Sequence, residues 1–328
     1  MERTLKIFVT GASGFVGGAM VTALGLNHEI VAMSRSKESD DRILALGATP
    51  VHCDLEIVKK EQLEGCDIVI HCAAHIGPGG PREYYWASNV MGTDRLLHVA
   101  KRAGVKKFIH IGTEAGCFYG QHMHEIDESY PLSSKSPFYY SETKAEAERR
   151  VMAANDPDNG FEALSIRPRL IWGPGDQTVL PGLLQAVDND MFRWIDHGRY
   201  LTSTTYIDNL VHAVTLAIEN GQGGEVYFIT DGEKFSFNNF LTRLLESQGR
   251  KVSEKSVPGW LVRFLARWIQ TIWALFKISS TPPITPFEAN LMSRDCTISI
   301  DKARRELGYH PIVSVEEGLA FLKSGSSV

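Results

Sequence analysis

A glycine-rich segment near the start of the chain places the strongest constraint on the fold. Residues 10–17 read Thr-Gly-Ala-Ser-Gly-Phe-Val-Gly and follow directly on an apolar run, Leu5–Thr10. From Phe15 onward, apolar residues recur at the spacing of one helical face. Glycines at these intervals permit a tight turn between a strand and a helix, and they let the backbone approach a pyrophosphate at the helix N-terminus. The segment therefore predicts a βα unit that binds a dinucleotide.

The rest of the first half alternates short apolar runs with helical patterns. Such alternation is typical of right-handed βαβ units and of a parallel sheet covered on both faces. The expected strands are Leu5–Thr10, Ile30–Met33, Pro50–Cys53, Asp67–Cys72, Phe108–Ile111 and Ala163–Arg167. Together these patterns predict an α/β fold with a doubly wound parallel sheet of the Rossmann type.

After residue 172 the pattern becomes less regular, and Gly173-Pro174-Gly175-Asp176 predicts a turn. A later helix and strand indicate a return to the main sheet, and two further helices are expected near the end. These four segments are Asp208–Glu219, Val226–Thr230, Ser236–Ser247 and Ser314–Leu322, the last with a Ser314-x-x-Glu317 capping box.

The chain has 328 residues, which allows about two domains of ~100–200 residues each. We expect a Rossmann domain over 1–172, to which 205–232 returns. A smaller, discontinuous substrate-binding cap is expected over 173–204 and 233–328.

Composition excludes several classes of protein. Apolar residues make up 43% of the chain and charged residues 22%, which is typical of a globular protein. The formal net charge of −5 offers no positive field for a nucleic-acid partner. The five cysteines are odd in number and form no Cys-x-x-Cys motif, and the segment from Met1 to Leu5 lacks the zones of a secretory signal. We therefore expect a reducing, cytoplasmic location.

The end of the second expected strand bears on the choice of cofactor. An acidic residue there would bind a ribose 2′-hydroxyl, whereas an arginine would accept a 2′-phosphate. This chain has Ser34-Arg35-Ser36 at that place. Arg35 can pair with the phosphate, assisted by a serine hydroxyl, so NADP(H) is expected and NAD(H) is the alternative. The other interpretation of Arg35 is a solvated surface cation.

A tyrosine and a lysine supply candidate chemistry further along. Tyr140 and Lys144 stand four residues apart at the start of an expected helix, so they share a face. A free phenol, with a pKa near ~10, exchanges protons poorly at neutral pH, and a neighbouring ammonium eases that exchange. The alternative is an ordinary pair on a surface helix.

Taken in order, Gly11, Gly14, Gly17, Tyr140 and Lys144 resemble the motifs of the extended short-chain dehydrogenases/reductases. The resemblance implies further catalytic residues. Thr113, at the end of the fifth strand, would orient the reacting oxygen, and Asn89 would support the catalytic lysine.

The resemblance also implies a set of cofactor contacts. Asp54 and Leu55 would lie near the adenine, the loop after Cys72 near the pyrophosphate, and Pro168 to Ile171 near the nicotinamide. The full expected set is Gly11, Ser13, Gly14, Phe15, Val16, Gly17, Ser34, Arg35, Asp54, Leu55, Ala73, Ala74, His75, Tyr140, Lys144, Pro168, Leu170 and Ile171.

Within that superfamily, the segments Arg167–Asp176 and Tyr206–Asn209 resemble the 3β-hydroxysteroid dehydrogenase and sterol-decarboxylating branch and its bacterial ketoreductase relatives. Two departures stand beside Thr113: an unexplained acid, Glu114, and a glycine, Gly112, where the family often has a hydroxyl residue.

The resemblance implies hydride transfer between NADP(H) and a secondary alcohol or ketone of a small, fairly apolar substrate, steroid-like or β-keto acid-like. Tyr140 would be the acid or base, and a homodimer is expected. A sugar-nucleotide epimerase with tightly bound NAD and a non-catalytic NADP-binding regulator are the alternatives.

An aromatic stretch over 260–277 is the least typical part of the sequence. Its large apolar residues fall on one helical face, and Arg263 and Arg267 lie on the other. A packing helix or subunit contact, a lid over an apolar substrate and a peripheral membrane contact are all compatible with this pattern.

No group of histidines, cysteines and acids has metal-ligand spacing in the sequence, so no metal is expected. His71, His75 and His110 are interpreted as satisfied polar positions near strand ends. The segment His122-Met123-His124 is interpreted as a solvated loop, with a metal-binding pair as the alternative.

Overall fold

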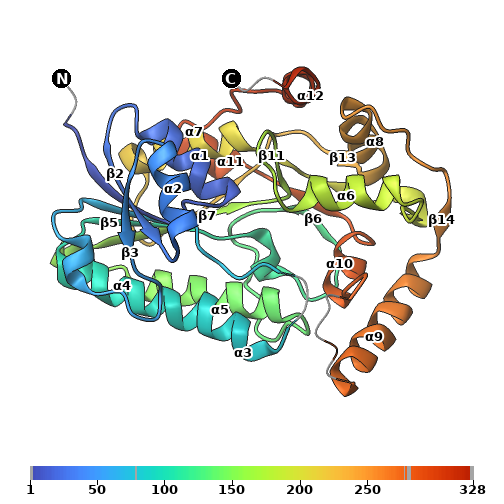
Figure 1. Cartoon of the computed structure of the whole chain (residues 1–328), viewed down its shortest axis with the longest axis horizontal. Helices are drawn as coiled ribbons and strands as arrows, with labels where there is room; N and C mark the ends of the chain where they lie inside the picture. Colours follow the sequence, from blue (N-terminus) through green and yellow to red (C-terminus); the bar gives the residue numbers. More distant parts are fainter. Residues whose placement is uncertain (1–2, 78–79, 277, 279–281, 326–328) are drawn as a thin grey trace.

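The computed structural model describes residues 3–77, 80–276, 278 and 282–325 (Figure 1). Both ends of the chain, residues 78–79 in the expected Rossmann domain and Lys277 at the end of the expected aromatic helix lie outside the described residues.

A seven-stranded sheet forms the centre of the molecule, with strand order β12-β7-β5-β4-β1-β2-β3. All of its neighbouring strands pair in parallel. The strands are β1 (Lys6–Thr10), β2 (Glu29–Ser34), β3 (Thr49–His52), β4 (Ile68–His71), β5 (Lys107–Ile111), β7 (Glu162–Pro168) and β12 (Val226–Ile229). The predicted doubly wound sheet is confirmed, including the return of Val226–Thr230 to its edge.

Helices cover both faces of this sheet, because its central strands are apolar on both sides. On one face lie α1 (Phe15–Leu24), α2 (Lys37–Ala45), α7 (Ile207–Asn220) and α11 (Asp301–Glu306), which share one apolar core with the strands. On the other face lie α3 (Arg82–Tyr85), α4 (Gly92–Ala103) and α5 (Tyr139–Ala154), and a second core fills the space beneath α4 and α5.

A smaller four-stranded sheet stands beside the main one, in the order β13-β10-β15-β6. Its strands are β6 (Met123–Ile126), β10 (Leu201–Thr202), β13 (Phe235–Ser236) and β15 (Cys296–Ile298), and β6 pairs with β15 in parallel. Two further parallel pairs join β8 (Ile171–Trp172) to β11 (Thr205–Tyr206) and β9 (Trp194–Ile195) to β14 (Ser256–Val257).

The helices of this part are α6 (Val179–Asp188), α8 (Phe237–Ser247), α10 (Pro286–Leu291) and α12 (Val315–Ser324). The predicted capping box of α12 is present: Ser314 Oγ accepts from the Glu317 N–H, and a Glu317 oxygen accepts from the Ser314 N–H. Single helical turns, one of them π-helical, occupy η1 (Lys60–Leu63), η2 (Trp86–Met91), η3 (Glu114–Cys117), η4 (Pro157–Asn159) and η5 (Asp196–Gly198).

The interpretation of His122-Met123-His124 as a loop is wrong. Met123 begins strand β6 and is fully buried, and it pairs with Cys296 of β15. The strand forms because Met123 and Ile126 bury their side chains in an apolar cluster with Cys296 and Ile298. His124 therefore stands on a strand, and His122 immediately precedes it.

The expected aromatic helix is present as α9 (Gly259–Leu275), which lies at the edge of the molecule (Figure 1). Ala266 is its fully buried contact with the body, and α9 packs beside α10. The large apolar residues that predicted the helix are mostly exposed: Trp260, Phe264, Leu265, Trp268, Ile272 and Leu275. Among the described residues, no helix is long and apolar enough to span a bilayer.

Candidate active site

The glycine-rich loop adopts the conformation that its sequence predicts. Gly11 has a φ of +70°, and a Cβ there would come within 2.9 Å of the Ala73 nitrogen. A Cβ on Gly17 would lie 2.2 Å from the Gly11 oxygen, so helix α1 can approach the end of β1 only with glycine at this position. Among the described residues no side chain caps α1, which begins after Gly14 in extended conformation. The first-turn amides suit an anion, and the loop therefore fits a dinucleotide pyrophosphate.

The residues expected to determine the preference between NADP and NAD lie at the end of β2. Ser34 is buried and donates to the Ser36 oxygen, while Ser36 Oγ caps α2 by accepting from the Ser39 N–H. Arg35 stands exposed between the strand and the helix, and it forms no ion pair with any described residue. A cation next to a helix N-terminus is a suitable place for a phosphate.

The loops after β3 and β4 lie beside the glycine-rich loop. Ala73 donates its N–H to Thr10 Oγ1 at 3.1 Å, and Ala74 and His75 continue the chain from there. One Asp54 oxygen is engaged in its own turn, because Oδ1 accepts from the N–H groups of Glu56 and Ile57. Leu55, one residue on, belongs to the apolar core beneath α4. Among the described residues, no hydrogen bond engages the Oδ2 atom of Asp54.

Lys144 is buried on α5, and its ammonium has two partners. It donates to the Ile111 oxygen at 2.8 Å, and it lies 3.4 Å from Nε2 of His110. Burial lowers the pKa of Lys144 to about 8. Burial and the Lys144 charge also hold the pKa of His110 well below its usual range, so this imidazole is neutral and accepts from the ammonium.

Tyr140, at the start of the same helix, is held in its protonated form. Burial raises the pKa of Tyr140, the carboxylate of Glu114 raises it further, and a hydrogen bond with Thr113 acts in the opposite direction. The ring of Phe287, from α10, meets the Tyr140 ring edge to face at a centroid distance of 5.5 Å. A phenol that keeps its proton, beside a second hydroxyl, can donate that proton to a substrate oxygen.

Glu114, which the sequence left unexplained, is a buried part of this site. Its Oε2 atom accepts from the Thr113 hydroxyl at 2.7 Å, and its Oε1 atom pairs with the guanidinium of Arg169. Arg169 is itself buried and donates to Thr202 Oγ1. The pair orients the Thr113 hydroxyl, and the positive charge of Arg169 compensates the buried carboxylate.

A second buried ion pair explains Gly112. Glu148 of α5 pairs with Arg167 of β7 and accepts from the Ser165 hydroxyl. A Cβ on Gly112 would lie 2.7 Å from Ser165 Oγ and 3.0 Å from Glu148 Oε2. Any larger residue at this position would displace the pair that joins helix α5 to the sheet.

Asn89 lies on the π-helical turn η2 and connects two loops of the site. Its Oδ1 accepts from the His75 N–H at 2.6 Å, and its Nδ2 donates to the His75 oxygen and to Thr143 Oγ1. Asn89 therefore bonds Thr143, the residue before Lys144, and within the described part of the chain it makes no hydrogen bond to the lysine itself.

The three histidines near strand ends differ from one another. His71 matches the expectation, because its two nitrogens bond Thr10 and Thr93. His75 Nε2 and His110 Nδ1 are buried without a hydrogen-bond partner among the described residues.

The segment expected near the nicotinamide begins at the last residue of β7. Pro168 ends that strand, and Leu170 adopts a φ of +41°, which is unusual for a residue with a branched side chain. Ile171 then begins β8. Thr205 holds the turn, because its Oγ1 donates to the oxygen of Arg169 and accepts from the N–H of that residue. Such backbone strain persists where surrounding contacts maintain it.

Sequence reasoning missed Arg169, Glu148, Phe287 and Asp231. A signal was available for the two ion pairs: Arg167 and Arg169 stand at the end of an apolar strand, where a buried cation requires an acid. No such signal was available for Phe287 or Asp231, because their partners come from distant segments of the chain. Asp231 accepts hydrogen bonds from Trp172, Thr204, Tyr206 and Asn209.

Comparisons with known proteins agree with this geometry. A model described as the 3-beta hydroxysteroid dehydrogenase/isomerase family matches residues 8–258. The chain is 38% identical to the 4-hydroxy-2-methyl-3-oxo-4-farnesyl-3,4-dihydroquinoline-1-oxide ketoreductase of Stigmatella aurantiaca, over 97% of this chain and 96% of that protein. It is 32% identical to the 2-alkyl-3-oxoalkanoate reductase of Stenotrophomonas maltophilia, over 98% of this chain and 100% of that protein.

Among solved structures, the UDP-glucuronic acid 4-epimerase of Bacillus cereus in complex with NAD has a TM-score of 0.74 at 22% identity. The match covers 98% of this chain and 100% of the epimerase chain. At this identity the likeness shows a shared fold. The family model and the two reductases show more: this chain is an oxidoreductase of the short-chain dehydrogenase/reductase type, and it belongs to the 3-beta hydroxysteroid dehydrogenase/isomerase family.

Proposed function

We propose that the protein is an NADP-dependent ketoreductase that interconverts a ketone and a secondary alcohol on a fairly apolar substrate. One observation carries the proposal: the Tyr140 phenol is kept protonated beside the Thr113 hydroxyl, which suits proton donation to a ketone oxygen. The two reductases to which the chain is similar are named for a farnesyl quinoline oxide and for 2-alkyl-3-oxoalkanoates. Both names describe a keto group with an apolar substituent.

The side chains divide the work of the reduction. NADPH, when bound, would supply the hydride that reduces the ketone carbon. Tyr140 gives its proton to the ketone oxygen, so the alcohol product contains the hydride on its carbon and the proton on its oxygen. Thr113, oriented by Glu114, holds that oxygen. We expect the positive charge of Lys144, while it stays protonated, to ease proton exchange by the phenol. Asn89 keeps η2 against α5 through Thr143.

Aromatic rings beside Tyr140 support an apolar substrate. Phe287 contacts the Tyr140 ring, and Phe118 and Phe138 stack on each other at 5.6 Å and meet Phe287 edge to face. Apolar side chains at this position favour a hydrocarbon or ring system over a sugar.

The preference for NADP rests on Arg35 and the N-terminus of α2. Replacement of Arg35 by aspartate should reverse the preference, because the acid repels a 2′-phosphate and accepts from a ribose hydroxyl. We expect the ratio of kcat/KM for NADPH to that for NADH to fall at least about tenfold, an interaction of ~1.4 kcal/mol. Arg42→Asp, on the exposed face of α2, is the matched control. An unchanged ratio in Arg35→Asp would remove the assignment.

A screen of NADPH oxidation tests the reaction. The panel contains ketosteroids, 2-alkyl-3-oxo acids and aromatic ketones, with Tyr140→Phe as the control that binds cofactor. Turnover by the native protein, lost in the variant, supports the proposal. Isomerisation of a UDP-sugar without added cofactor would instead favour an epimerase. Stoichiometric NADPH binding without turnover on any compound would favour a regulator.

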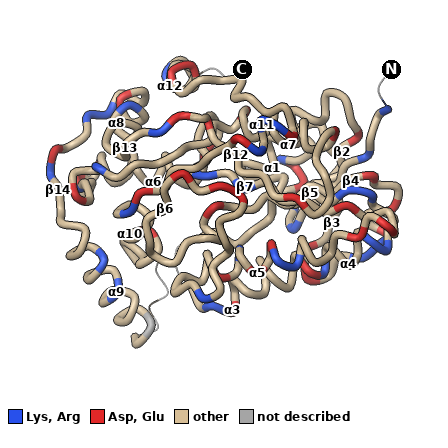
Figure 2. Tube along the Cα trace, turned by 180° about the vertical axis from the view of Figure 1, so that it is seen from behind, with Lys and Arg blue, Asp and Glu red and all other residues tan. Residues whose placement is uncertain are grey.

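Helix α9 suggests a peripheral contact with a membrane that carries anionic lipids. Its exposed side chains are large and apolar, and Gly259–Leu275 contains Arg263 and Arg267 but no acid, in a chain of net charge −5. In Figure 2 the trace of α9 carries Lys or Arg positions, in blue, and no Asp or Glu position, in red. An apolar surface flanked by arginines suits the interface of such a bilayer.

Flotation with anionic and with neutral vesicles tests this contact. Phe264→Ser with Trp268→Ser should abolish binding to anionic vesicles, while Leu26→Ser with Ile57→Ser, at exposed apolar residues elsewhere, should leave it intact. If the α9 double variant still floats with the vesicles but loses turnover, α9 is a lid over the substrate instead. If its molecular mass in sedimentation is half that of the native protein, α9 is a subunit contact. The expected homodimer and the cytoplasmic location stay predictions.

A further inference from the structure

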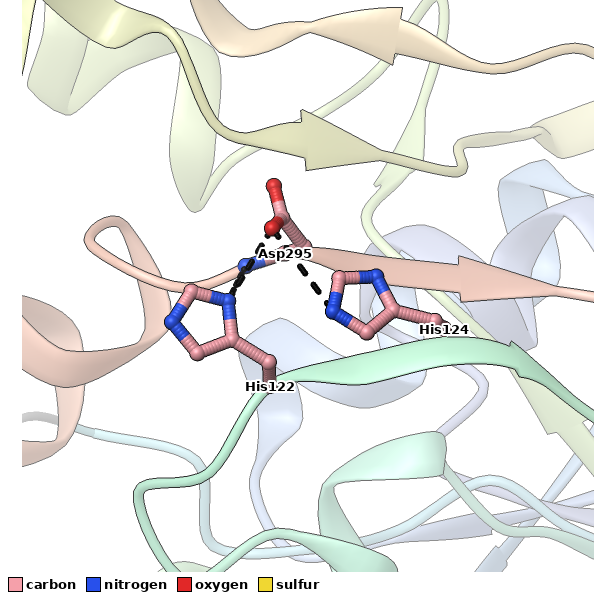
Figure 3. A group of neighbouring side chains, drawn as sticks. All are labelled: His122, His124 and Asp295. Carbon is pink, nitrogen blue, oxygen red and sulfur yellow. Dashed lines mark hydrogen bonds and ion pairs between the residues drawn. The ribbon is translucent and has the colours of Figure 1, made fainter.

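The smaller sheet brings together three metal-ligating side chains that are far apart in the sequence. His122 immediately precedes β6 and His124 is its second residue, so this spacing of two places their side chains on the same face of the extended segment. Asp295 immediately precedes β15, the parallel neighbour of β6, in which Cys296 pairs with Met123. Figure 3 shows the two imidazoles and the carboxylate directed toward one another.

The distances approach those of a metal site. Asp295 Oδ2 lies 3.0 Å from His122 Nδ1 and 3.9 Å from His124 Nε2, and the three ligand atoms all lie within 4.8 Å of one another. Ligand atoms at ~2.1 Å from a tetrahedral zinc ion are about 3.4 Å apart. A small rotation of His124, the most exposed of the three, would complete the arrangement.

Hydrogen bonds hold two of the ligands in position. Asp295 Oδ1 accepts from the Leu201 N–H at 2.7 Å, which leaves Oδ2 for the histidines. The backbone N–H of Asp295 donates to His122 Nδ1 at 3.1 Å. Nδ1 has a single lone pair, so a metal ion bound there would replace this hydrogen bond and would lie between Nδ1 and Asp295 Oδ2, which are 3.0 Å apart. The bond from the Leu201 N–H to the other carboxylate oxygen is of the kind that orients metal ligands in known sites.

We propose that His122, His124 and Asp295 bind a divalent transition-metal ion of the zinc class. Two imidazoles and one carboxylate suit such an ion, and the exposure of the histidines leaves room for water as the remaining ligand. The ion would join β6 to β15 and stabilise the smaller sheet. None of these three residues takes part in the reaction proposed for Tyr140 and Thr113, so the proposal does not depend on that reaction.

Zinc titration of the chelator-treated, full-length protein by calorimetry tests the site. We expect one equivalent of Zn²⁺ to bind and to raise the unfolding temperature. His124→Gln and Asp295→Asn should each weaken binding at least about tenfold. Asparagine keeps an oxygen for the Leu201 N–H, which limits damage to the fold.

His52→Gln is the matched control. His52 also lies near an acid, with its Nδ1 atom 4.0 Å from Asp40 Oδ2, but it belongs to no group of three metal-ligating side chains among the described residues. This variant should bind zinc like the native protein. Absence of stoichiometric binding would reduce the cluster to an ordinary His122–Asp295 ion pair. Native affinity in both His124→Gln and Asp295→Asn would assign the metal to other groups, such as the thiols. Either result overturns the proposal. Circular dichroism of metal-free variants confirms that each is folded.

Discussion

Helices α1 and α9 are both rich in apolar residues, but α1 buries these residues whereas α9 exposes most of them to solvent. In α1, Met20, Val21 and Leu24 are almost completely buried between the sheet and α7. In α9, Trp268 keeps 55% and Leu275 73% of its surface exposed. An apolar pattern in the sequence therefore predicts a helix, but it does not indicate which surface, if any, packs against the apolar face of that helix. Helix α1 is enclosed by the sheet and its neighbours, whereas α9, at the edge of the molecule, leaves large apolar side chains exposed.

If the chemistry belongs to the buried half, the largest effect should come from Tyr140. Tyr140→Phe removes the proton donor and keeps the ring against Phe287. We expect kcat for ketone reduction to fall about 10³-fold, with the Kd for NADPH little changed. Stopped-flow turnover and fluorescence titration of NADPH measure the two quantities. Near-native turnover would remove the proton-donor role.

The buried ion pairs sharpen the same comparison. Glu114→Gln leaves Arg169 buried without its counter-charge, and we expect the free energy of unfolding to fall by about 3 kcal/mol. Asp188→Asn breaks the exposed pair with Arg250 and should leave stability nearly unchanged, because water and salt screen that pair. Urea unfolding at pH 7 compares the two. Equal losses would show that burial does not decide their contribution.

Burial also predicts a pH dependence. Because the pKa of Lys144 is lowered to about 8, its ammonium loses its proton as the pH rises through that value. The kcat/KM for NADPH, which reports on the free enzyme, should therefore fall about tenfold per pH unit above ~8. Burial raises the pKa of Tyr140, so the phenol does not account for this limb.

Lys144→Arg is the control for this pH profile. The guanidinium stays charged, so the variant should be slower but flat between pH 7 and pH 9. A native profile that stays flat up to pH 10 would contradict a depressed lysine pKa.

The smallest effect should come from the exposed helix. Leu24→Ala opens a cavity beneath α1 and should cost about 2–5 kcal/mol. Phe264→Ser, on the exposed face of α9, should change the free energy of unfolding by less than about 0.5 kcal/mol. Thermal unfolding of the lipid-free protein measures both. A large loss at Phe264 would mean that α9 contributes to the fold itself.

Much of the first half could be predicted because its signals are local. The glycines of residues 11–17 meet steric demands of neighbouring backbone, and each expected strand of the main sheet is present. The segment Tyr206–Asn209 could be noticed only as a resemblance. Its physical role is to join distant segments, since Asn209 bonds Asp231 and the backbone of Val313.

The prediction of a loop at His122-Met123-His124 was wrong for a related reason. Two polar residues around one apolar residue suit an exposed loop or an edge strand equally well. Only the pairing of β6 with β15, which begins more than 160 residues later, decides between them.

By itself the sequence predicted the parallel sheet and the conformation of the glycine-rich loop, because periodicity and glycine sterics act over a few residues. The set Thr113, Tyr140 and Lys144 could be noticed only as a resemblance to a family. Tertiary structure alone decided which charges became buried pairs, where Glu114 finds Arg169, and that His122 and His124 face Asp295. Electrostatic partners and the desolvation that shifts a pKa depend on which surfaces meet, and a linear pattern does not contain that information.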